Sequence, residues 1–248
     1  MKIAVCVSHV PDTTSKIIVG QDGKNIDPNG LTFIINPYDE FAVEEALRLK
    51  EKFTGEVVVL SVGKDFVKES IKKAYAMGVD KGIWIKTEAE LDSHSTAKLL
   101  VEQLNIIKPD IILFGKQSID YDSGQVGILV AEMLNIPSVS VVTKLEINDN
   151  KVSCEREIEG GKETVETKLP VVITAQKGLN EPRYPNLKGI MAAKSKPIQE
   201  VASTSVENKI EILKMKKPES KSKGRILGSD ASAVKELINV LHNELKLV

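Results

Sequence analysis

Short apolar segments alternate with amphipathic helical segments as far as residue 134, and this alternation limits the folds open to the chain. β-rich apolar runs occur at five places, which are 2–8, 31–35, 56–62, 82–85 and 110–114. Apolar residues at helical spacing fill the intervals between them and predict helices at 40–52, 65–77, 95–107 and up to residue 134. Strands linked by helices form right-handed crossovers in a mostly parallel sheet. The pattern therefore predicts an α/β fold with a doubly wound, mostly parallel sheet.

The pattern changes after residue 139. Three strand-like segments follow one another with only turns between them, at 141–148, 151–159 and 163–169. Consecutive strands joined by turns pair antiparallel, so we expect an antiparallel β excursion. An apolar run at 170–175 is typical of a strand buried in the main sheet.

The C-terminal tail differs in character from residues 1–205, which we expect to form the α/β domain. Between residues 214 and 225 several lysines and one arginine accompany a single acidic residue, Glu219, and this composition predicts a flexible linker within 206–248. A final helix then has apolar residues on one face, at Val234, Leu237, Ile238, Leu241 and Leu245. We expect this face to pack on the chain's own core or on a partner subunit.

Composition indicates a globular protein with a core. The 248 residues are 42% hydrophobic and 28% charged, with a net charge of −1, which argues against a nucleic-acid binder or an anionic-membrane binder. We expect no membrane span and no targeting peptide, because the apolar runs are far shorter than the ~20 residues that a span requires. Cys6 falls in a strand and has no metal-like spacing to Cys154, so a cytoplasmic location is expected.

The familiar catalytic motifs are missing from the sequence. No phosphate-binding G-x-x-x-x-G-K-[ST] loop, no G-x-G-x-x-G fingerprint and no G-x-S-x-G elbow occurs. His9, His94 and His242 are too far apart in sequence to suggest a metal site, although His9 at a strand end could contact a ligand. We therefore expect no catalytic residue and no metal.

A ligand crevice is expected where the carboxyl ends of the parallel strands meet. The segments that end or follow these strands are Ser8–His9, Asn36–Asp39, Val62–Gly63 and Gly115–Gly127. In the last segment small residues open a helix, whose free backbone amides favour a phosphate or another anion. The alternative is that the polar side chains of these segments only cap helices, with Asp39 capping the helix that starts at residue 40.

A proline-braced loop lies between residues 178 and 197. Pro182 and Pro185 restrict the backbone on either side of Arg183 and Tyr184. Asn186 is a suitable N-cap for a short helix whose apolar face contains Leu187, Ile190 and Met191. The loop is either a surface turn with packed side chains or a preorganised docking element.

Six blocks of the sequence resemble the β subunit of electron transfer flavoproteins (ETF). They are VCVSHVPDT at 5–13, NPYDEFAVEEALRLKE at 36–51, AMGVDKG at 76–82, GKQSIDYDSGQVG at 115–127, EREIEGGKETVETKLPVVIT at 155–174 and LNEPRYPNLKGIMAAKSKP at 179–197. The last two are close to a signature of the family. The likeness runs to about residue 200 and implies an adenine-nucleotide-binding, Rossmann-like fold.

The resemblance implies a heterodimer with an ETF α subunit that holds the redox-active flavin adenine dinucleotide (FAD). The β chain would bind AMP as a structural ligand or, in the electron-bifurcating branch, a second FAD. Val126 and the VPDT run are similar to the bifurcating branch. The nucleotide contacts that the resemblance implies are Cys6, Asn36, Pro37, Tyr38, Asp39, Val62, Asp122, Ser123, Gly124, Gln125, Val126 and Gly127.

The resemblance also implies an electron carrier of fatty acid β-oxidation, with no substrate turnover of its own. Electrons would come from acyl-CoA dehydrogenases and related flavoprotein dehydrogenases and would leave to an ETF-quinone oxidoreductase. The recognition loop at 179–197 would dock these partners, with Leu187 as the anchor. Its docking residues would be Arg183, Tyr184, Leu187, Ile190 and Met191.

Two other functions fit the same fold. In a bifurcating ETF, the FAD of this subunit would take electrons from NADH. A stand-alone ATP-binding stress-type module would need a glycine-rich phosphate motif late in the chain, where this sequence instead has a β-hairpin, the recognition loop and a linker.

Overall fold

A nine-stranded sheet forms the centre of the protein, as the computed structural model shows for residues 1–219 and 224–247. The strand order is β11-β5-β4-β1-β6-β10-β7-β8-β9. The strands are β1 (Lys2–Cys6), β4 (Glu56–Gly63), β5 (Lys81–Lys86), β6 (Ile111–Gly115), β7 (Ser138–Asn148), β8 (Lys151–Ile158), β9 (Gly161–Lys168), β10 (Val171–Ala175) and β11 (Gln199–Ala202). The strands from β11 to β7 are parallel, while β8 and β9 pair antiparallel. The predicted α/β class and the antiparallel excursion are confirmed.

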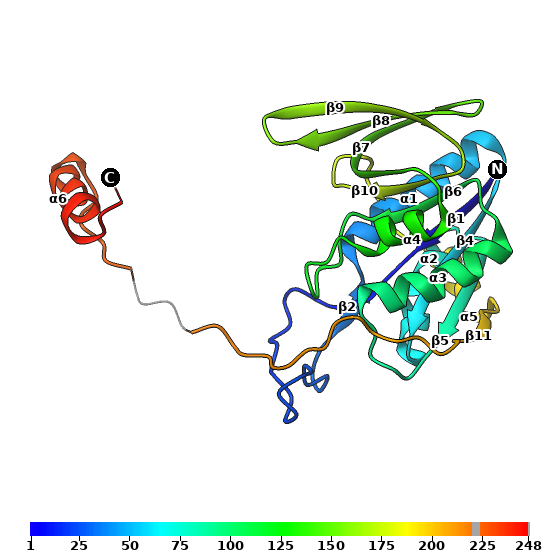
Figure 1. Cartoon of the computed structure of the whole chain (residues 1–248), viewed down its shortest axis with the longest axis horizontal. Helices are drawn as coiled ribbons and strands as arrows, with labels where there is room; N and C mark the ends of the chain where they lie inside the picture. The colour runs from blue at the N-terminus through cyan, green and yellow to red at the C-terminus, as the bar shows by residue number, and fades with distance from the viewer. Residues whose placement is uncertain (220–223, 248) are drawn as a thin grey trace.

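Helices cover both faces of the sheet, as Figure 1 shows. They are α1 (Pro37–Phe53), α2 (Lys68–Met77), α3 (Ser93–Ile107), α4 (Val126–Leu134) and α5 (Leu187–Ser195). Side chains alternate along each strand, so β1 contributes Ile3 and Val5 to the core under α1 and α2. Ala4 and Cys6 of the same strand belong to the core under α3 and α4. The result is a three-layer α/β/α arrangement.

The strand order reverses between β1 and β6. From β1 the chain adds β4 and then β5 on one side, and the crossover through α3 returns it to the other side as β6. In open parallel sheets, ligands bind beyond the carboxyl ends of the strands at such a switch point. The ends of β1 and β6 therefore mark the place to look for a site.

Helix α1 begins earlier than the sequence pattern predicts. It starts at Pro37, with Asn36 as a cap residue that makes no side-chain capping bond. Proline fits the first position of a helix because its missing N–H would have no partner there. Asp39 therefore lies inside the first turn, and the prediction that it caps the helix is wrong.

Two short strands, β2 (His9–Pro11) and β11, have no clear signal in the sequence. Strands β2 and β3 (Phe33–Ile35) form a separate two-stranded antiparallel sheet. The predicted strand at 31–35 thus pairs outside the main sheet. Strand β11 extends the main sheet by pairing with β5. A 3-10 turn, η1 (Asp65–Val67), precedes α2.

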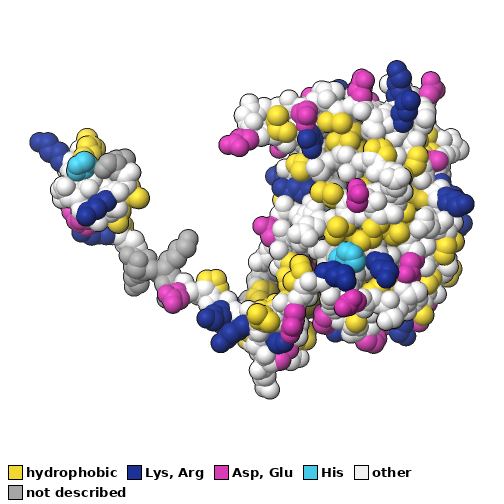
Figure 2. All heavy atoms as spheres, in the orientation of Figure 1, with side chains coloured by type: hydrophobic (Ala, Val, Ile, Leu, Met, Phe, Trp, Pro, Cys, Tyr) yellow, Lys and Arg dark blue, Asp and Glu magenta, His cyan; other side chains and the backbone are white. Residues whose placement is uncertain are grey.

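The C-terminal tail ends in a helical segment that lies apart from the sheet in Figure 1. It consists of η2 (Ala231–Ala233), α6 (Val234–Asn239) and a π-helical turn, η3 (Val240–Glu244). Asp230 caps it by accepting from the Ser232 amide at 2.8 Å. Figure 2 shows apolar side chains on the surface of this segment, and Leu237 is about half exposed. Lys221 and Lys223 of the predicted linker lie outside the described residues.

Charges of both signs are interspersed on the face of the body that Figure 2 shows. In the described residues, no helix is long and apolar enough to cross a membrane.

Candidate functional site

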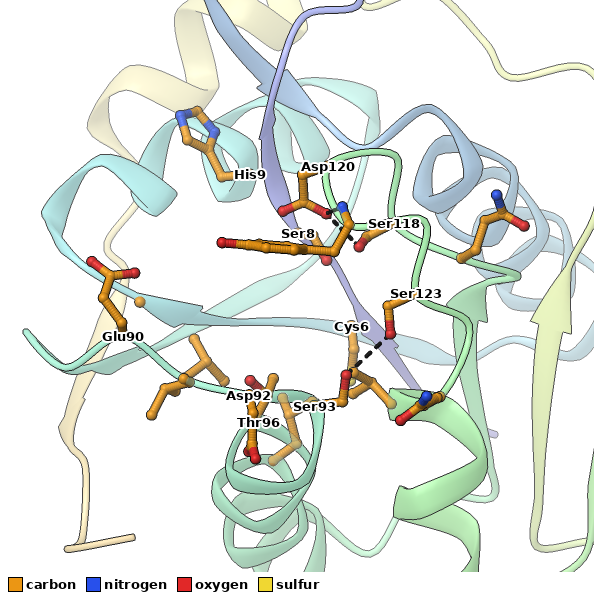
Figure 3. Close-up of a pocket in the computed structure, with 18 of the residues that line it drawn as sticks. Cys6, Ser8, His9, Glu90, Asp92, Ser93, Thr96, Ser118, Asp120 and Ser123 are labelled. Atoms are coloured by element: carbon orange, nitrogen blue, oxygen red, sulfur yellow. Dashed lines mark hydrogen bonds between the residues drawn. The ribbon is translucent and has the colours of Figure 1, made fainter. Parts of the chain in front are cut away.

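A cleft of about 840 Å³ opens at the switch point, beyond the ends of β1, β4 and β6. This volume lies toward the upper end of the ~300–1,000 Å³ typical of small-molecule sites. The close-up in Figure 3 shows side chains converging on it from several segments. Eight of the predicted nucleotide-binding residues line it, namely Cys6, Asp39, Val62, Ser123, Gly124, Gln125, Val126 and Gly127.

The floor of the cleft is held together by Asp39. Its carboxylate accepts from the Ser8 amide at 2.7 Å and from the Gly115 amide at 3.0 Å. These amides follow β1 and end β6, so a single side chain ties the two strand ends at the switch point. Burial raises the pKa of Asp39 to about 7, against the opposing effect of these hydrogen bonds.

Glycine is required at position 115. A Cβ atom there would lie 2.4 Å from Oδ1 of Asp39 and 2.6 Å from the Tyr38 carbonyl carbon. Because one of these is backbone, a larger residue would displace α1 from β6. The close approach of α1 to the cleft floor thus depends on Gly115.

Cys6 lies on the same floor as a buried thiol. Burial raises its pKa well above the usual range, and the negative charge of Asp39 adds to this. The thiol therefore stays protonated near neutral pH, which makes it a packing group rather than a nucleophile.

The N-terminus of α4 faces the cleft with its first-turn amides available. Gln125 is the cap residue and makes no side-chain capping bond, so these amides have no capping partner on it. Gly127 lets the helix approach the sheet, because a Cβ there would lie 3.0 Å from the Thr174 methyl and 3.2 Å from the Phe114 ring. Backbone amides and small residues at a helix start suit the phosphate of a nucleotide.

A second helix start, that of α3, lies beside the first and was not predicted as part of the site. Ser93 Oγ and Ser123 Oγ are 3.0 Å apart, and Figure 3 shows this hydrogen bond. Ser93 and Thr96 both line the cleft. Helix α3 follows β5 in the chain, so it starts at the edge of the sheet where the parallel strands end. This position in the βα order is the sequence signal that points to α3 as part of the site.

Four predicted nucleotide-binding residues do not line the cleft but shape the loop beside it. Asn36 is buried, donates to the Gln117 carbonyl at 2.9 Å and accepts from the Ile119 amide at 3.3 Å. The Tyr38 ring lies under the ammonium of Lys116, 4.9 Å from its centroid. Pro37 starts α1, and Asp122 has a left-handed backbone and accepts from the side-chain amide of Gln117.

The mouth of the cleft contains aromatic side chains. His9 stacks on Phe33 at 5.4 Å and lies 5.5 Å from Phe66. His9 Nδ1 is 2.8 Å from Ser70 Oγ. Partial burial lowers the pKa of His9, although the charge of Glu69 opposes this. A neutral imidazole and a half-exposed phenyl ring form a surface on which a planar group can stack.

Residues of the C-terminal tail also line the cleft. Asn208 through Ile212 lie along its mouth. Two ion pairs lie among the lining residues. Lys64 Nζ is 2.5 Å from Glu90 Oε1, and Lys24 Nζ is 2.9 Å from Glu211 Oε1. No sequence pattern indicates this placement, because a segment without helix or strand has no periodicity.

The recognition loop forms a second feature on a different part of the surface. Tyr184 is 96% exposed, Leu187 81% and Met191 71%, while Ile190 is partly covered at 41%. Asn186 caps α5 by accepting from the Gly189 amide at 2.8 Å. The structure thus brings four of the five predicted docking residues together as an exposed, largely apolar surface.

Arg183 is oriented differently, toward α1. Its Nε donates to Glu44 at 2.8 Å and its Nη1 to Glu51 at 2.6 Å. At the other end of the loop, Tyr75 donates to the Pro197 carbonyl at 2.7 Å, and Lys196 to the Val79 carbonyl at 2.7 Å. The loop is therefore fixed at both ends, with its apolar side chains facing outward.

Comparison with known proteins places these features in a family context. A model of the electron transfer flavoprotein domain matches residues 25–206. The electron transfer flavoprotein subunit beta of Bacillus subtilis strain 168 is 39% identical over 259 residues, covering 100% of both chains. That of Syntrophomonas wolfei is 44% identical over 225 residues, covering 90% of this chain and 88% of the relative. The mitochondrial subunit beta of Arabidopsis thaliana is 36% identical over 255 residues, again covering both chains fully.

Proposed function

This chain belongs to the electron transfer flavoprotein family as a β subunit, and we propose that it is the nucleotide-holding, partner-docking half of a heterodimeric electron carrier. Its companion would be an ETF α subunit that holds the redox-active FAD. Electrons would enter from flavoprotein dehydrogenases, acyl-CoA dehydrogenases above all, and leave to an ETF-quinone oxidoreductase.

The exposed, preorganised Leu187 is the observation that best supports this proposal. A large apolar side chain that is 81% exposed forfeits the free energy of burial unless a partner covers it. The loop around it is fixed by Arg183 and Tyr75, so docking costs little conformational entropy. Tyr184 and Met191 enlarge the contact, while Arg183 acts by positioning the loop.

The cleft fits an adenine nucleotide. The amides at the start of α4 would hold a phosphate, and Ser93 and Ser123 offer hydroxyl groups beside it. The apolar side chains of Leu60, Val62 and Leu100 offer a surface for a base. AMP in this position would serve as a structural ligand that ties the strand ends to α3 and α4.

A second FAD is the other candidate ligand, and two features of the cleft suit it. The volume of about 840 Å³ and the aromatic pair His9 and Phe66 at the mouth suit a ligand with a second planar ring. With FAD bound here, the redox chemistry of a bifurcating ETF that oxidises NADH becomes available.

Heat release of the nucleotide from the purified complex, followed by chromatography, tests the ligand assignment. AMP alone supports the structural role, and a second equivalent of FAD supports the bifurcating form. Recovery of ATP from a homodimer that contains no flavin would instead support the stress-type module and contradict the assignment to an electron carrier.

A Leu187→Ala variant tests the docking role. Truncating a central anchor typically costs about 2 kcal/mol or more, which corresponds to about a 30-fold weaker interaction with the dehydrogenase. Ile106→Ala is a matched control, because Ile106 is also exposed but lies at the end of α3. Dehydrogenase-coupled flavin reduction should slow in the first variant alone; equal rates would contradict the docking role.

A further inference from the structure

A segment of the tail, residues 208–212, crosses the mouth of the cleft, and we refer to it as the strap. It lies beyond residues 25–206, which the family model matches. It follows β11, bends at Lys209 and contains no helix or strand of its own. Asn208, Lys209, Ile210, Glu211 and Ile212 all line the cleft.

One side chain of the body, Asp92, holds the start of the strap. Its Oδ2 accepts from the Lys209 amide at 2.5 Å and from the Ile210 amide at 3.0 Å. Its Oδ1 accepts from the Ser95 amide at 2.7 Å and so caps α3. Burial acts to raise the pKa of Asp92, but the three amides outweigh it and the net shift is downward. The carboxylate therefore stays ionised and joins the strap to a helix start that lines the cleft.

Further contacts fix the strap along its length. Asn208 accepts from the Asp92 amide at 3.0 Å and donates to the Glu90 carbonyl at 2.8 Å. Glu211 pairs with Lys24 at 2.9 Å across the mouth. Beyond the strap, the Met215 amide donates to the Gly23 carbonyl at 2.7 Å. The strap is thus joined to the α3 side of the cleft at one end and to the turn around residue 23 at the other.

The strap also presents apolar side chains that the chain itself leaves uncovered. Ile210 and Ile212 are the two apolar residues of the strap. Both line the cleft, yet Ile210 is 63% and Ile212 37% exposed. A ligand in the cleft would cover part of this surface.

We propose that the strap is part of the nucleotide site: it closes the mouth over the bound nucleotide, and Asp92 and Asn208 are the positioning residues that hold it closed. This inference rests on the proposed nucleotide-binding function. The nucleotide leaves when the strap detaches, so the hydrogen bonds to Asp92 and Asn208 set its residence time. The tail continues from the strap to α6, so the segment that retains the nucleotide is continuous with the C-terminal helix.

Two substitutions test the strap directly. Asp92→Asn retains an oxygen that can cap α3, since asparagine is as good a cap as aspartate, but places an amide group against two N–H donors of the strap. Asn208→Ala removes both bonds to the loop at 90–92 without altering α3. The matched control is Thr204→Ala, which removes a 2.7 Å hydrogen bond between the same tail and Glu102, outside the cleft.

The measurement is the release rate of radiolabelled AMP, and separately of FAD, from the full-length protein with its partner subunit after a chase with unlabelled nucleotide. Since each hydrogen bond contributes a factor of about 2 to 10, both strap variants should release nucleotide about tenfold faster than the wild type and the Thr204→Ala control. The free energy of unfolding of nucleotide-free Asn208→Ala should match the wild type, which separates a strap effect from loss of folding.

The outcomes separate the two proposals. Equal release rates from the wild type and both strap variants would overturn the strap while leaving nucleotide binding intact. A wild-type protein that retains neither AMP nor FAD would overturn the nucleotide-binding function itself, and the role of the strap with it.

Discussion

Helix α1 holds both functional regions of this protein through two carboxylates in contrasting environments. Asp39, under the cleft, accepts hydrogen bonds from the backbone amides of Ser8 and Gly115. Glu44, under the recognition loop, accepts from the guanidinium groups of Arg183 and Arg48. The two carboxylates are similarly buried, but within residues 1–219 and 224–247 only Glu44 has a cationic partner.

This difference shifts the two pKa values in opposite directions. Burial raises the pKa of Asp39 to about 7. Burial also acts to raise the pKa of Glu44, but hydrogen bonds from Arg183 and Arg48 outweigh it, and the net shift is downward. The stabilisation at Asp39 is therefore complete at low pH and is lost as the pH rises toward 7. The stabilisation at Glu44 is present above its unfolded pKa and is lost as the pH falls through its folded pKa.

The largest expected effect concerns the cleft floor. In the wild type, ionisation of Asp39 should lower the free energy of unfolding by about 2–3 kcal/mol between pH 5 and pH 8. An Asp39→Asn variant has no carboxyl group at this position, so this pH dependence should be absent from it. Denaturant unfolding of both proteins at the two pH values measures this difference. Asp22→Asn, at an exposed turn, is the control and should leave the pH dependence between 5 and 8 unchanged. A variant with the wild-type pH dependence would show that Asp39 titrates normally.

The next effect tests whether the recognition loop depends on α2 as well as on α1. A Cβ at Gly189 would lie 2.4 Å from the Ala76 carbonyl oxygen of α2, so Gly189→Val must displace α5. Such overpacking typically costs about 1–3 kcal/mol. Thermal or denaturant unfolding should show this loss, and dehydrogenase docking should weaken with it. Gly224→Val, where the added atom meets nothing, should have neither effect.

A smaller effect is expected when the ion pair of the recognition loop is broken. Arg183→Ala leaves the buried Glu44 with Arg48 alone. Losing a partner of a buried charge costs about 3–5 kcal/mol, but Arg183 is 36% exposed, and solvent screening reduces our expectation to about 1–2 kcal/mol.

Two measurements sharpen this prediction. The destabilisation by Arg183→Ala should diminish as the pH falls through the pKa of Glu44, opposite to the trend at Asp39. Amide hydrogen exchange in residues 179–197 should increase in the variant. Arg156→Ala, which breaks a surface pair with Glu163 on the hairpin, should leave exchange in the loop unchanged.

The contrast between the two carboxylates also shows where sequence patterns succeed and fail. Periodicity predicted the main-sheet strands and the helices up to residue 134, because each has an apolar face that must be buried. Asp39 was predicted as a helix cap, since a carboxylate near a helix start is usually one. The structure instead uses it to accept amides from Ser8 and Gly115, which are distant in the sequence, and no local pattern reveals such a contact.

The candidate site divides in the same way. The segment Ser123–Gly127 was predicted because glycine and small polar residues at a helix start have a local chemical meaning. The strap and Asp92 were missed, because their contacts join the tail to a loop more than a hundred residues away. Arg183 was predicted as a docking residue, and its pairing with α1 depends on how the loop folds back. Contacts of this kind are determined by the tertiary fold rather than by periodicity.

The smallest expected effect concerns α6. It has an apolar face like α5, but the hydrogen bonds and ion pairs found for it in the described part of the chain all join it to other residues of the tail. Leu237 is 46% exposed, and Figure 1 shows its helix apart from the sheet. Leu237→Ser should therefore change the free energy of unfolding of the isolated chain by less than about 0.5 kcal/mol, as is usual for surface substitutions. Denaturant unfolding of the chain without its partner measures this change. Leu113→Ala, in the core, is the control and should lower the free energy of unfolding by about 2–5 kcal/mol, which shows that the assay detects the loss of a packed side chain. If Leu237→Ser lowered the free energy of unfolding by more than about 1 kcal/mol, α6 would pack on its own domain. The protein would then have a third region, held by apolar contacts, beside the cleft and the recognition loop that carboxylates of α1 hold.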